Sequence, residues 1–352
     1  MQTDFISSSD QRWREALRAT QHDVYDLPEY VAVCGKYENA VPVAFYASEG
    51  AQCCLIPLLQ RPLPSSLGAP ASWSDAASPY GYSSALFVGG GEWPLRAVKA
   101  FVRTCAERDI ISVFVRLHPL LFVPAAALDF AGIRVTHGNT VHVDLTVPEH
   151  TLHAQLRNDH RLRIRRLYAQ KFNVAIDDWS LFDRFMQIYW EAMRHLGADQ
   201  YYFFPAGYFR ELREALGPRL HLLSVIAPDC SVAAAGLFTE TNGIAQFHLS
   251  GTAQEHQRSA PSKLMLDSAI TWSRATGNRV LHLGGGVGSR EDGLYEFKAG
   301  FSRLRSPFQT WRVVCDPTRY SELLGTSGAL NPLADGFFPA YRKPEQLLIP
   351  TR

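Results

Sequence analysis

The chain has 352 residues, which is enough for one large domain or two medium ones with sizeable cores. Its 35 Lys and Arg side chains nearly balance 34 Asp and Glu, for a net charge of +1, which excludes a generally basic nucleic-acid coat protein but not a local basic patch. With 46% hydrophobic and 20% charged residues, the composition is that of a globular protein and excludes a disordered chain.

Cysteine usage and apolar runs indicate the compartment. The six cysteines include no CxxC pair and no zinc-ligand spacing, so we expect reduced thiols and no metal site. The N-terminal residues lack the charged and apolar regions of a signal peptide. The longest apolar run, residues 120–133, is too short for a membrane span of about 20 residues. We therefore expect a cytoplasmic protein without an integral membrane segment.

The first half alternates helical and strand patterns. Helices are expected over residues 10–18, 28–36 and 94–108, and strands over 41–48, 51–59, 110–116 and within 134–147. Residues 61–82 are rich in Pro, Ser, Gly and Ala and are interpreted as a long irregular loop. Loops of that length within a compact domain are often functional.

The second half begins near Pro148 and repeats the same rough order of elements. Helices are expected over residues 151–170, 180–196, 205–216, 262–276 and 292–299, and strands over 220–227, 232–239, 244–250, 279–283 and 308–314. Three antiparallel strands before a helix–strand crossover favour an α+β fold over a doubly wound sheet. The order predicts two diverged copies of one unit, residues 1–150 and 151–352.

Two segments of the second half resemble motifs of the Fem-type branch of the GNAT acyltransferase superfamily. They are residues 189–204, with Met193-Arg194 before Tyr201-Tyr202-Phe203-Phe204, and residues 282–301, with Gly284-Gly285-Gly286 before Phe297-Lys298-Ala299-Gly300-Phe301. In the first half, residues 78–82 and 116–119 resemble segments of relatives linked to exopolysaccharide. The resemblance covers most of the chain, but it is strong only over residues 148–314.

The resemblance implies two tandem GNAT-like domains, each a mixed sheet flanked by helices. Residues 1–150 would take the acceptor, and residues 151–352 would hold the acyl donor and the catalytic groups. The implied reaction moves an aminoacyl group from aminoacyl-tRNA to an amine on a small molecule, peptide or sugar nucleotide, forming an amide bond in cell-wall or natural-product biosynthesis. Beyond this co-substrate the resemblance implies no cofactor, and no DNA partner.

Two other functions remain open from the sequence. The first is an N-acyltransferase of the same fold that uses acyl-CoA or an acyl-carrier protein, in exopolysaccharide or natural-product assembly. The second is a catalytically inactive module that binds a sugar nucleotide or a lipid-linked glycan.

Three side chains near the glycine run are the catalytic candidates. Lys298 matches the lysine of the family motif, whose ammonium is implied to stabilise the oxyanion or the leaving hydroxyl at the scissile ester. The alternative is a surface lysine beside a core pair of phenylalanines. Asp292 is either an acid–base residue or a helix cap. His282 is either a general base or a core histidine.

The glycine segments bear on donor recognition. Gly284, Gly285 and Gly286 either let a substrate backbone approach closely and present N–H donors, or simply form a tight turn. Most GNAT proteins cradle the CoA pyrophosphate with glycines in the segment that corresponds to residues 257–263, but here those glycines are absent and Pro261 has no N–H. This departure favours a donor other than CoA, and it leaves Arg258 as a substrate-binding candidate.

Aromatic and basic side chains supply the other binding candidates. Aromatic rings beside arginine suit stacking on a sugar or base and pairing with an acidic acceptor, which makes an acceptor set of Tyr80, Tyr82, Arg116 and His118. Tyr201 and Tyr202 are candidates for the acyl channel. Core packing is the alternative for both groups.

The predicted helix over residues 151–170 is strongly basic. Arg157, Arg161 and Arg165 recur every fourth residue, so on one continuous helix they would share a face. Like charges at this spacing repel one another, and opposing phosphates would relieve the repulsion. The three arginines are therefore candidates for contact with tRNA or another phosphate, with a solvated face of internal salt bridges as the alternative.

Overall fold

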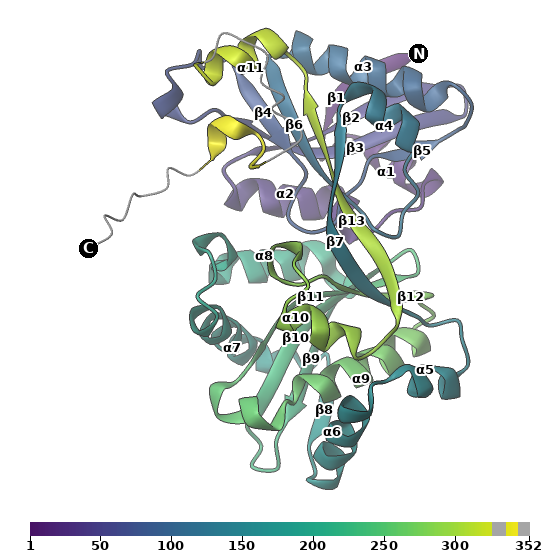
Figure 1. The fold of residues 1–352 in the computed structure, drawn as a ribbon, viewed down its shortest axis with the longest axis vertical. Coiled ribbons are helices and arrows are strands. Elements are labelled where there is room, and N and C mark those ends of the chain that lie inside the picture. Colours follow the sequence, from purple (N-terminus) through teal and green to yellow (C-terminus); the bar gives the residue numbers. More distant parts are fainter. Residues whose placement is uncertain (326–335, 344–352) are drawn as a thin grey trace. The chain divides into compact units, whose positions relative to one another are not determined.

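The computed structural model describes residues 1–325 and 336–343 (Figure 1). By its internal contacts the chain forms two compact units: unit 1 contains residues 1–21, 25–136 and the described part of 309–352, and unit 2 contains 22–24 and 137–308. The division differs from the expected one at residue 150. Strands β7 (Ile133–Asp144) and β13 (Leu304–Val314) each have one end in either unit, so the chain returns to unit 1 after residue 308.

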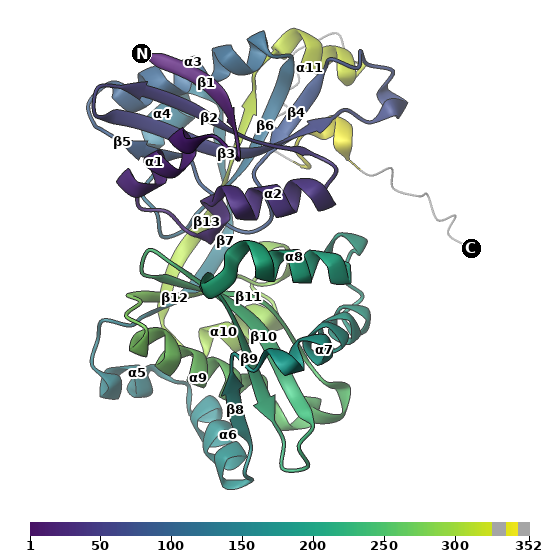
Figure 2. The ribbon, with the colours of Figure 1, turned by 180° about the vertical axis from the view of Figure 1, so that it is seen from behind.

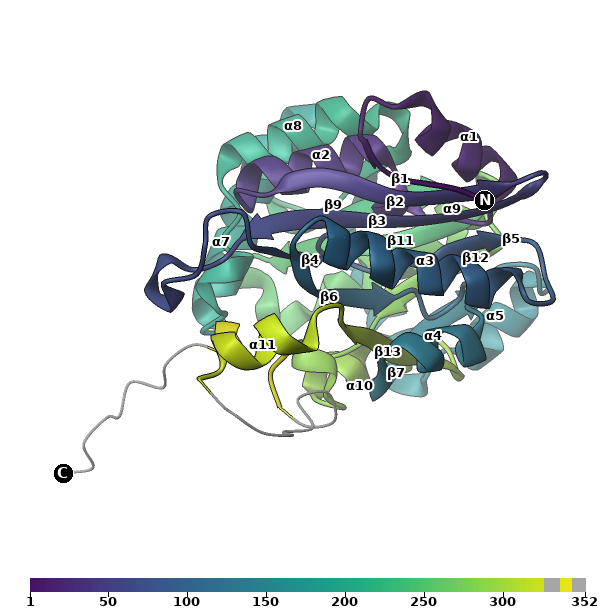
Figure 3. The same cartoon turned by 90° about the horizontal axis from the view of Figure 1, so that it is seen from above.

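Unit 1 is a sheet with helices on both faces. Its strands are β1 (Gln2–Ser7), β2 (Val41–Glu49), β3 (Gln52–Pro62), β4 (Ser74–Ala77), β5 (Leu86–Val88) and β6 (Ile110–Leu117), and its helices are α1 (Gln11–Ala19), α2 (Pro28–Tyr37), α3 (Trp93–Glu107), α4 (Ala125–Ala131) and α11 (Pro317–Leu323). The order is β1-β2-β3-β4-β6-β13, with β5 paired to β3. Figure 3 shows α1 and α2 on one side of β2 and β3 and α3 on the other, so residues 53–59 of β3 are buried on both faces.

Unit 2 has the same plan. Its strands beyond β7 are β8 (Asn173–Ile176), β9 (Leu220–Ile226), β10 (Val232–Thr241), β11 (Ile244–Thr252) and β12 (Val280–Gly284), and its helices are α5 (Glu149–Gln155), α6 (Asn158–Ala169), α7 (Phe182–His195), α8 (Ala206–Leu216), α9 (Ser262–Ala275) and α10 (Gly293–Ala299). The order is β7-β12-β11-β10-β9-β8 (Figure 2). Only β11 and β12 pair in parallel among the strand pairs of this unit in the described chain, and α9 is the crossover between them.

Helices α7 and α9 cover opposite faces of this sheet. Gly236 of β10 lies against Met265 of α9, whereas Gly251 of β11 lies against the backbone of Ile188 of α7. Gly236 pairs with Ser250, so Gly251, the next residue, faces the other way. The core on the α9 face is an apolar cluster that also includes Phe301.

The structure confirms the predicted α+β class of two units with mixed sheets, and it corrects several local predictions. The segment 61–82 is not wholly irregular, because β4 lies within it. The expected helix over residues 151–170 is two helices, since Leu156 and Arg157 are extended between α5 and α6. The patterns also did not reveal the elements β1, β5, α4, β8 and α11.

In the part of the chain that the structure describes, no helix combines the length and the hydropathy needed to cross a membrane.

Candidate active site

Strands β11 and β12 separate where the site begins. Their parallel pairing covers Ile244 to Gln246 on β11 and ends opposite His282 on β12, yet β11 continues to Thr252. Beyond this point the edge of β11 that faced β12 is no longer paired with it. Separated strands expose backbone N–H and C=O groups to which an extended substrate can hydrogen-bond.

Lys298 is buried beside this opening. Its residue surface is 8% exposed, and its Nζ donates a hydrogen bond of 2.6 Å to the carbonyl of Gly285, directly after β12. The Nζ also lies 5.7 Å from the ring centre of Phe247, on the part of β11 that has left β12. Burial lowers the Lys298 pKa to about 8, and nearby Asp292 partly opposes the shift. The surface-lysine alternative is therefore wrong: this ammonium is largely desolvated and can exchange a proton near neutral pH.

Asp292 holds the start of α10. Its Oδ1 accepts hydrogen bonds of 3.0 Å from the amides of both Leu294 and Tyr295, and its Oδ2 accepts one of 2.9 Å from the amide of Val287. These bonds keep its pKa below the usual range, although burial opposes them. They match the capping alternative, and an acid–base role for Asp292 remains a prediction.

The three glycines, Gly284 to Gly286, lie directly before the segment that Asp292 holds. Gly284 has a φ of +78°, and a Cβ on Gly286 would lie 2.1 Å from the carbonyl oxygen of Arg290 and 2.3 Å from Oδ1 of Asp292. The turn alternative therefore accounts for Gly284 and Gly286. Gly285 supplies the carbonyl that holds Lys298.

His282 lies on β12 at the last parallel pair. It is fully buried, and its Nδ1 is 2.8 Å from Oε1 of Gln246, its partner across the pair. Because an amide oxygen only accepts, this bond fixes the proton of the ring on Nδ1. The geometry fits the core-histidine alternative, and a role as general base remains a prediction.

The first turn of α9 lies where CoA-dependent relatives are expected to hold pyrophosphate. The amides of Lys263 and Leu264 donate to the carbonyls of Ala260 and Pro261, at 3.1 and 2.9 Å. The first turn thus uses these amides internally. Arg258 is exposed in the short helix that precedes this turn.

The candidate arginines of the basic segment are not equivalent. Arg157 is extended and precedes α6, so the prediction that it shares one helix face with Arg161 and Arg165 is wrong. The Nε of Arg157 is 2.6 Å from Oδ1 of Asp159, and Nη2 of Arg161 donates to the carbonyl of Leu156 at 3.1 Å. Arg165 is exposed on α6.

The four acceptor candidates lie close together in unit 1, at the end of β6 and in the loop after β4. Arg116 donates from its amide to Oγ of Ser78 at 2.9 Å and from Nη1 to the carbonyl of Ser78 at 3.1 Å. The ring centres of Tyr82 and His118 are 6.3 Å apart, and the carbonyl of Tyr80 accepts from Tyr30. The structure thus brings Tyr82 together with His118, and an acceptor site formed by all four residues remains a prediction.

The two acyl-channel candidates follow α7. Tyr201 is 40% exposed, and its ring centre lies 5.5 Å from that of Tyr202, whose carbonyl accepts a bond of 2.7 Å from the hydroxyl of Tyr189. This bond fixes the short helix Gln200–Tyr202 against α7. A substrate role for the two tyrosines stays a prediction.

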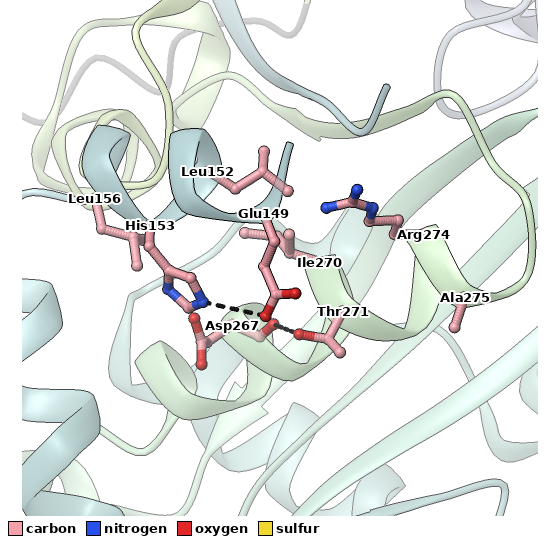
Figure 4. A pocket seen from close by; sticks show the side chains of 9 residues that line it. All are labelled: Glu149, Leu152, His153, Leu156, Asp267, Ile270, Thr271, Arg274 and Ala275. Carbon is pink, nitrogen blue, oxygen red and sulfur yellow. Dashed lines mark hydrogen bonds and ion pairs between the residues drawn. The ribbon is translucent and has the colours of Figure 1, made fainter. Parts of the chain in front are cut away.

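A hollow that sequence reasoning missed lies between α5 and α9 (Figure 4). Its volume is about 330 Å³, and its lining consists of Glu149, Leu152, His153, Leu156, Asp267, Ile270, Thr271, Arg274 and Ala275. Burial raises the Asp267 pKa, while His153 opposes the shift. No sequence signal marks this hollow, because its residues come from two helices more than a hundred residues apart and match no known spacing.

Comparisons with known proteins agree with this geometry. Residues 154–299 match the family model described as the acetyltransferase (GNAT) domain. This segment is therefore similar to GNAT acetyltransferase domains. It runs from α5 to α10 and ends one residue after Lys298, so it includes the separated strands, the crossover helix α9 and the candidate lysine.

Solved structures extend the fold beyond the GNAT domain. The crystal structure of FemX matches with a TM-score of 0.69 and 11% identity over 93% of this chain and 100% of that one. L-PGS from Bacillus licheniformis matches with a TM-score of 0.58 and 11% identity over 91% and 96%. A C-terminal domain from Agrobacterium fabrum, named as that of a lysylphosphatidylglycerol synthetase, matches with a TM-score of 0.55 and 14% identity over 90% and 93%. Over most of its length the chain therefore shares the fold of these structures. No curated protein matches the chain.

Proposed function

We propose that the protein is an aminoacyltransferase that moves an aminoacyl group from aminoacyl-tRNA to an amine acceptor and forms an amide bond. The observation that carries the proposal is the buried Lys298 ammonium at the point where β11 and β12 separate. The Fem-type resemblance supports the donor, and the likeness to a domain named for lysylphosphatidylglycerol synthesis is consistent with it.

The transfer needs one positive group that can also supply a proton. The acceptor amine attacks the ester carbonyl carbon, a C–N bond forms, and the carbonyl oxygen becomes negative. The C–O bond to the ribose then breaks, the leaving oxygen takes a proton from Lys298, and the lysine regains a proton from the acceptor nitrogen. A pKa of about 8 suits this exchange, because the ammonium predominates at neutral pH and still loses its proton readily.

The donor assignment depends on the first turn of α9. A CoA pyrophosphate needs backbone amides that point at it, and two of those amides are bonded inside the turn. The alternative, transfer from acyl-CoA or an acyl-carrier protein, is favoured by the description of the matched family as an acetyltransferase. A carrier-protein donor does not need the pyrophosphate cradle. The acceptor class, a cell-wall or natural-product amine, belongs to the proposal as the Fem-type resemblance implies it.

A donor assay tests the proposal. Purified protein is incubated with total tRNA charged with radiolabelled amino acids, with and without candidate amines, and separately with acetyl-CoA. We expect acceptor-dependent, ribonuclease-sensitive movement of label from tRNA to the amine, and the amino acid that moves identifies the donor. Consumption of acetyl-CoA with no loss of label from tRNA would overturn the proposal in favour of the CoA-dependent alternative.

A further inference from the structure

Helix α10 is short, and its two ends are held by different parts of unit 2. Asp292 bonds the amides at its start. In its last turn, the carbonyls of Phe297 and Lys298 accept from the amides of Gly300 and Phe301, at 3.3 and 3.0 Å. The N-terminal end of α6, which lies more than a hundred residues earlier in the chain, adds further donors to this turn.

His160 makes the central contact. Its ring is fully buried, and Nε2 lies 3.0 Å from the carbonyl oxygen of Phe297, the residue before Lys298. A carbonyl only accepts, so Nε2 carries the proton and donates. The ring also packs edge-on against Phe301 at 4.8 Å between centres, and a Cβ on Gly300 would lie 2.4 Å from it. Gly300 therefore lets the α10 backbone approach the imidazole closely.

Arg157 adds two bonds on the same side. Its amide donates to the carbonyl of Gly300 at 2.9 Å, and its Nη1 donates to the carbonyl of Glu296 at 3.4 Å. The α6 end thus contacts carbonyls on both sides of Lys298. This use of Arg157 is structural, and a contact of Arg157 with tRNA or another phosphate stays a prediction.

The Asp159 carboxylate ties these groups together. It lies 2.6 Å from Nε of Arg157, 2.8 Å from Nζ of Lys263 on α9 and 3.2 Å from Nδ1 of His160. The Arg157 bond in particular keeps the Asp159 pKa well below its usual range. One carboxylate therefore links the starts of α6 and α9. Burial lowers the His160 pKa and favours the neutral ring, and with the proton on Nε2 the Nδ1 atom has none to donate to Asp159.

We propose that His160 is a positioning residue that fixes the last turn of α10 and thereby holds the Lys298 ammonium at the Gly285 carbonyl, an inference that rests on the proposed role of Lys298. Without the Phe297 bond, the last turn of α10 loses a fixed partner, and Lys298 gains access to water. Its ammonium would then be better solvated and less well placed for the reacting ester.

The test measures the titration of the Lys298 side chain directly and does not require that aminoacyl transfer occurs. The ¹³Cε signal of Lys298, assigned by its loss in Lys298→Arg, is titrated by NMR in the whole protein. We expect a midpoint of about 8 in the parent. In His160→Leu, which removes the donor but keeps an apolar side chain, we expect the midpoint to rise by about one pH unit or more toward the ordinary lysine value. His160→Gln, which can still present an N–H near Nε2, should stay closer to the parent.

Two further variants keep the test decisive. His160→Asn keeps a polar side chain whose shorter amide does not reach the Phe297 carbonyl, so it tests the same bond if His160→Leu fails to fold, and it should move the midpoint in the same direction. His150→Leu makes the same chemical change as His160→Leu at an exposed histidine of α5 and should not move the midpoint. A folded His160→Leu or His160→Asn protein with an unchanged midpoint would overturn the inference.

Kinetic measurements distinguish failure of this inference from failure of the proposed function. If aminoacyl transfer occurs, His160→Leu should lower kcat by about tenfold or more with little change in the donor KM, because misplacement of a reacting group acts mainly on turnover. If the parent transfers nothing but the midpoint still depends on His160, the positioning stands and the proposed function fails. A merely structural role would lower the thermal stability without moving the midpoint.

Discussion

Each unit contains a pair of parallel strands joined by a crossover helix, and the two pairs end differently. In unit 1, β4 and β6 pair in parallel with α3 between them in sequence, and the pairing ends at Ala77 opposite Phe114. The chain beyond remains tied, since the amide of Ser78 donates to the carbonyl of Phe114 and Arg116 bonds Ser78 twice. In unit 2, β11 and β12 part after Gln246 and His282.

The difference distinguishes a structural feature of unit 1 from a candidate functional feature of unit 2. In unit 1, hydrogen bonds continue beyond the end of the β4–β6 pairing and stabilise the unit. In unit 2, the strands separate, and a buried ammonium lies next to the separation. A buried lysine with a lowered pKa costs stability, so its presence is more easily explained by chemistry than by packing. This contrast supports the proposal that unit 2 carries the reaction.

The largest expected effect comes from removing the ammonium. Lys298→Met keeps the length and apolar stem of the side chain but loses the charge and the proton. We expect kcat/KM for aminoacyl transfer to fall by about 10² to 10³, the usual cost of losing one group that stabilises an oxyanion. Single-turnover transfer from charged tRNA measures it, with Lys99→Met, an exposed lysine of α3, as the matched control. Unchanged turnover in Lys298→Met would contradict the proposal that Lys298 takes part in the reaction in unit 2.

The same substitution should stabilise the fold at neutral pH. The folded pKa of about 8 lies below the unfolded value of 10.5, so the unfolded state holds more protons between these values and parent stability rises with pH there. Below about pH 8 the full cost of burying the ammonium is present. We expect Lys298→Met to gain about 1–2 kcal/mol at pH 7, and the gain to shrink as pH approaches 10. Urea unfolding at several pH values tests this, and a gain that grows with pH would contradict the burial of the charge.

The third prediction concerns the acceptor candidates of unit 1. Arg116→Gln removes a guanidinium that could pair with an acidic acceptor, so we expect the acceptor KM to rise about tenfold with the donor KM unchanged. Ser78→Ala is the control, because it removes a bond to Arg116 but not the charge. If both variants lose stability equally and neither alters the acceptor KM, the role of Arg116 is only structural, to hold the chain together beyond the β4–β6 pairing.

Much of the fold could be predicted from the sequence, because helical periodicity and turn residues mark most elements locally. The Phe297-Lys298 segment also identified the central lysine. Strand β4 was missed because Ser74-Asp75-Ala76-Ala77 has low strand propensity, and its neighbours β3 and β6 determine its conformation. The break at Leu156 and Arg157 contains neither Gly nor Pro, although the polar Asn158-Asp159 pair that follows is a start signal for a new helix.

The local cap by Asp292 was among the alternatives from the sequence. The bonds of His160 and Arg157 to the carbonyls of α10 could not be predicted, since they join residues distant in the sequence. The lowered pKa of Lys298 depends on where β11 leaves β12, which is a matter of strand register rather than of residue type. The arginines illustrate the same limit, because their spacing suggested one shared face and the break between α5 and α6 removed Arg157 from it.

The smallest expected effect separates the arginines of the basic segment. Arg165 is exposed on α6, whereas Arg157 supports α10 through bonds to its backbone carbonyls. If the outer face of α6 contacts tRNA, Arg165→Gln should weaken donor binding a few-fold and reduce the slope of log affinity against log salt by about 1, with kcat unchanged. Arg157→Gln should instead lower kcat and leave the salt slope nearly intact. Filter binding of charged tRNA at several salt concentrations measures both, and equal salt slopes in Arg165→Gln and the parent would show that this face of α6 does not bind the donor.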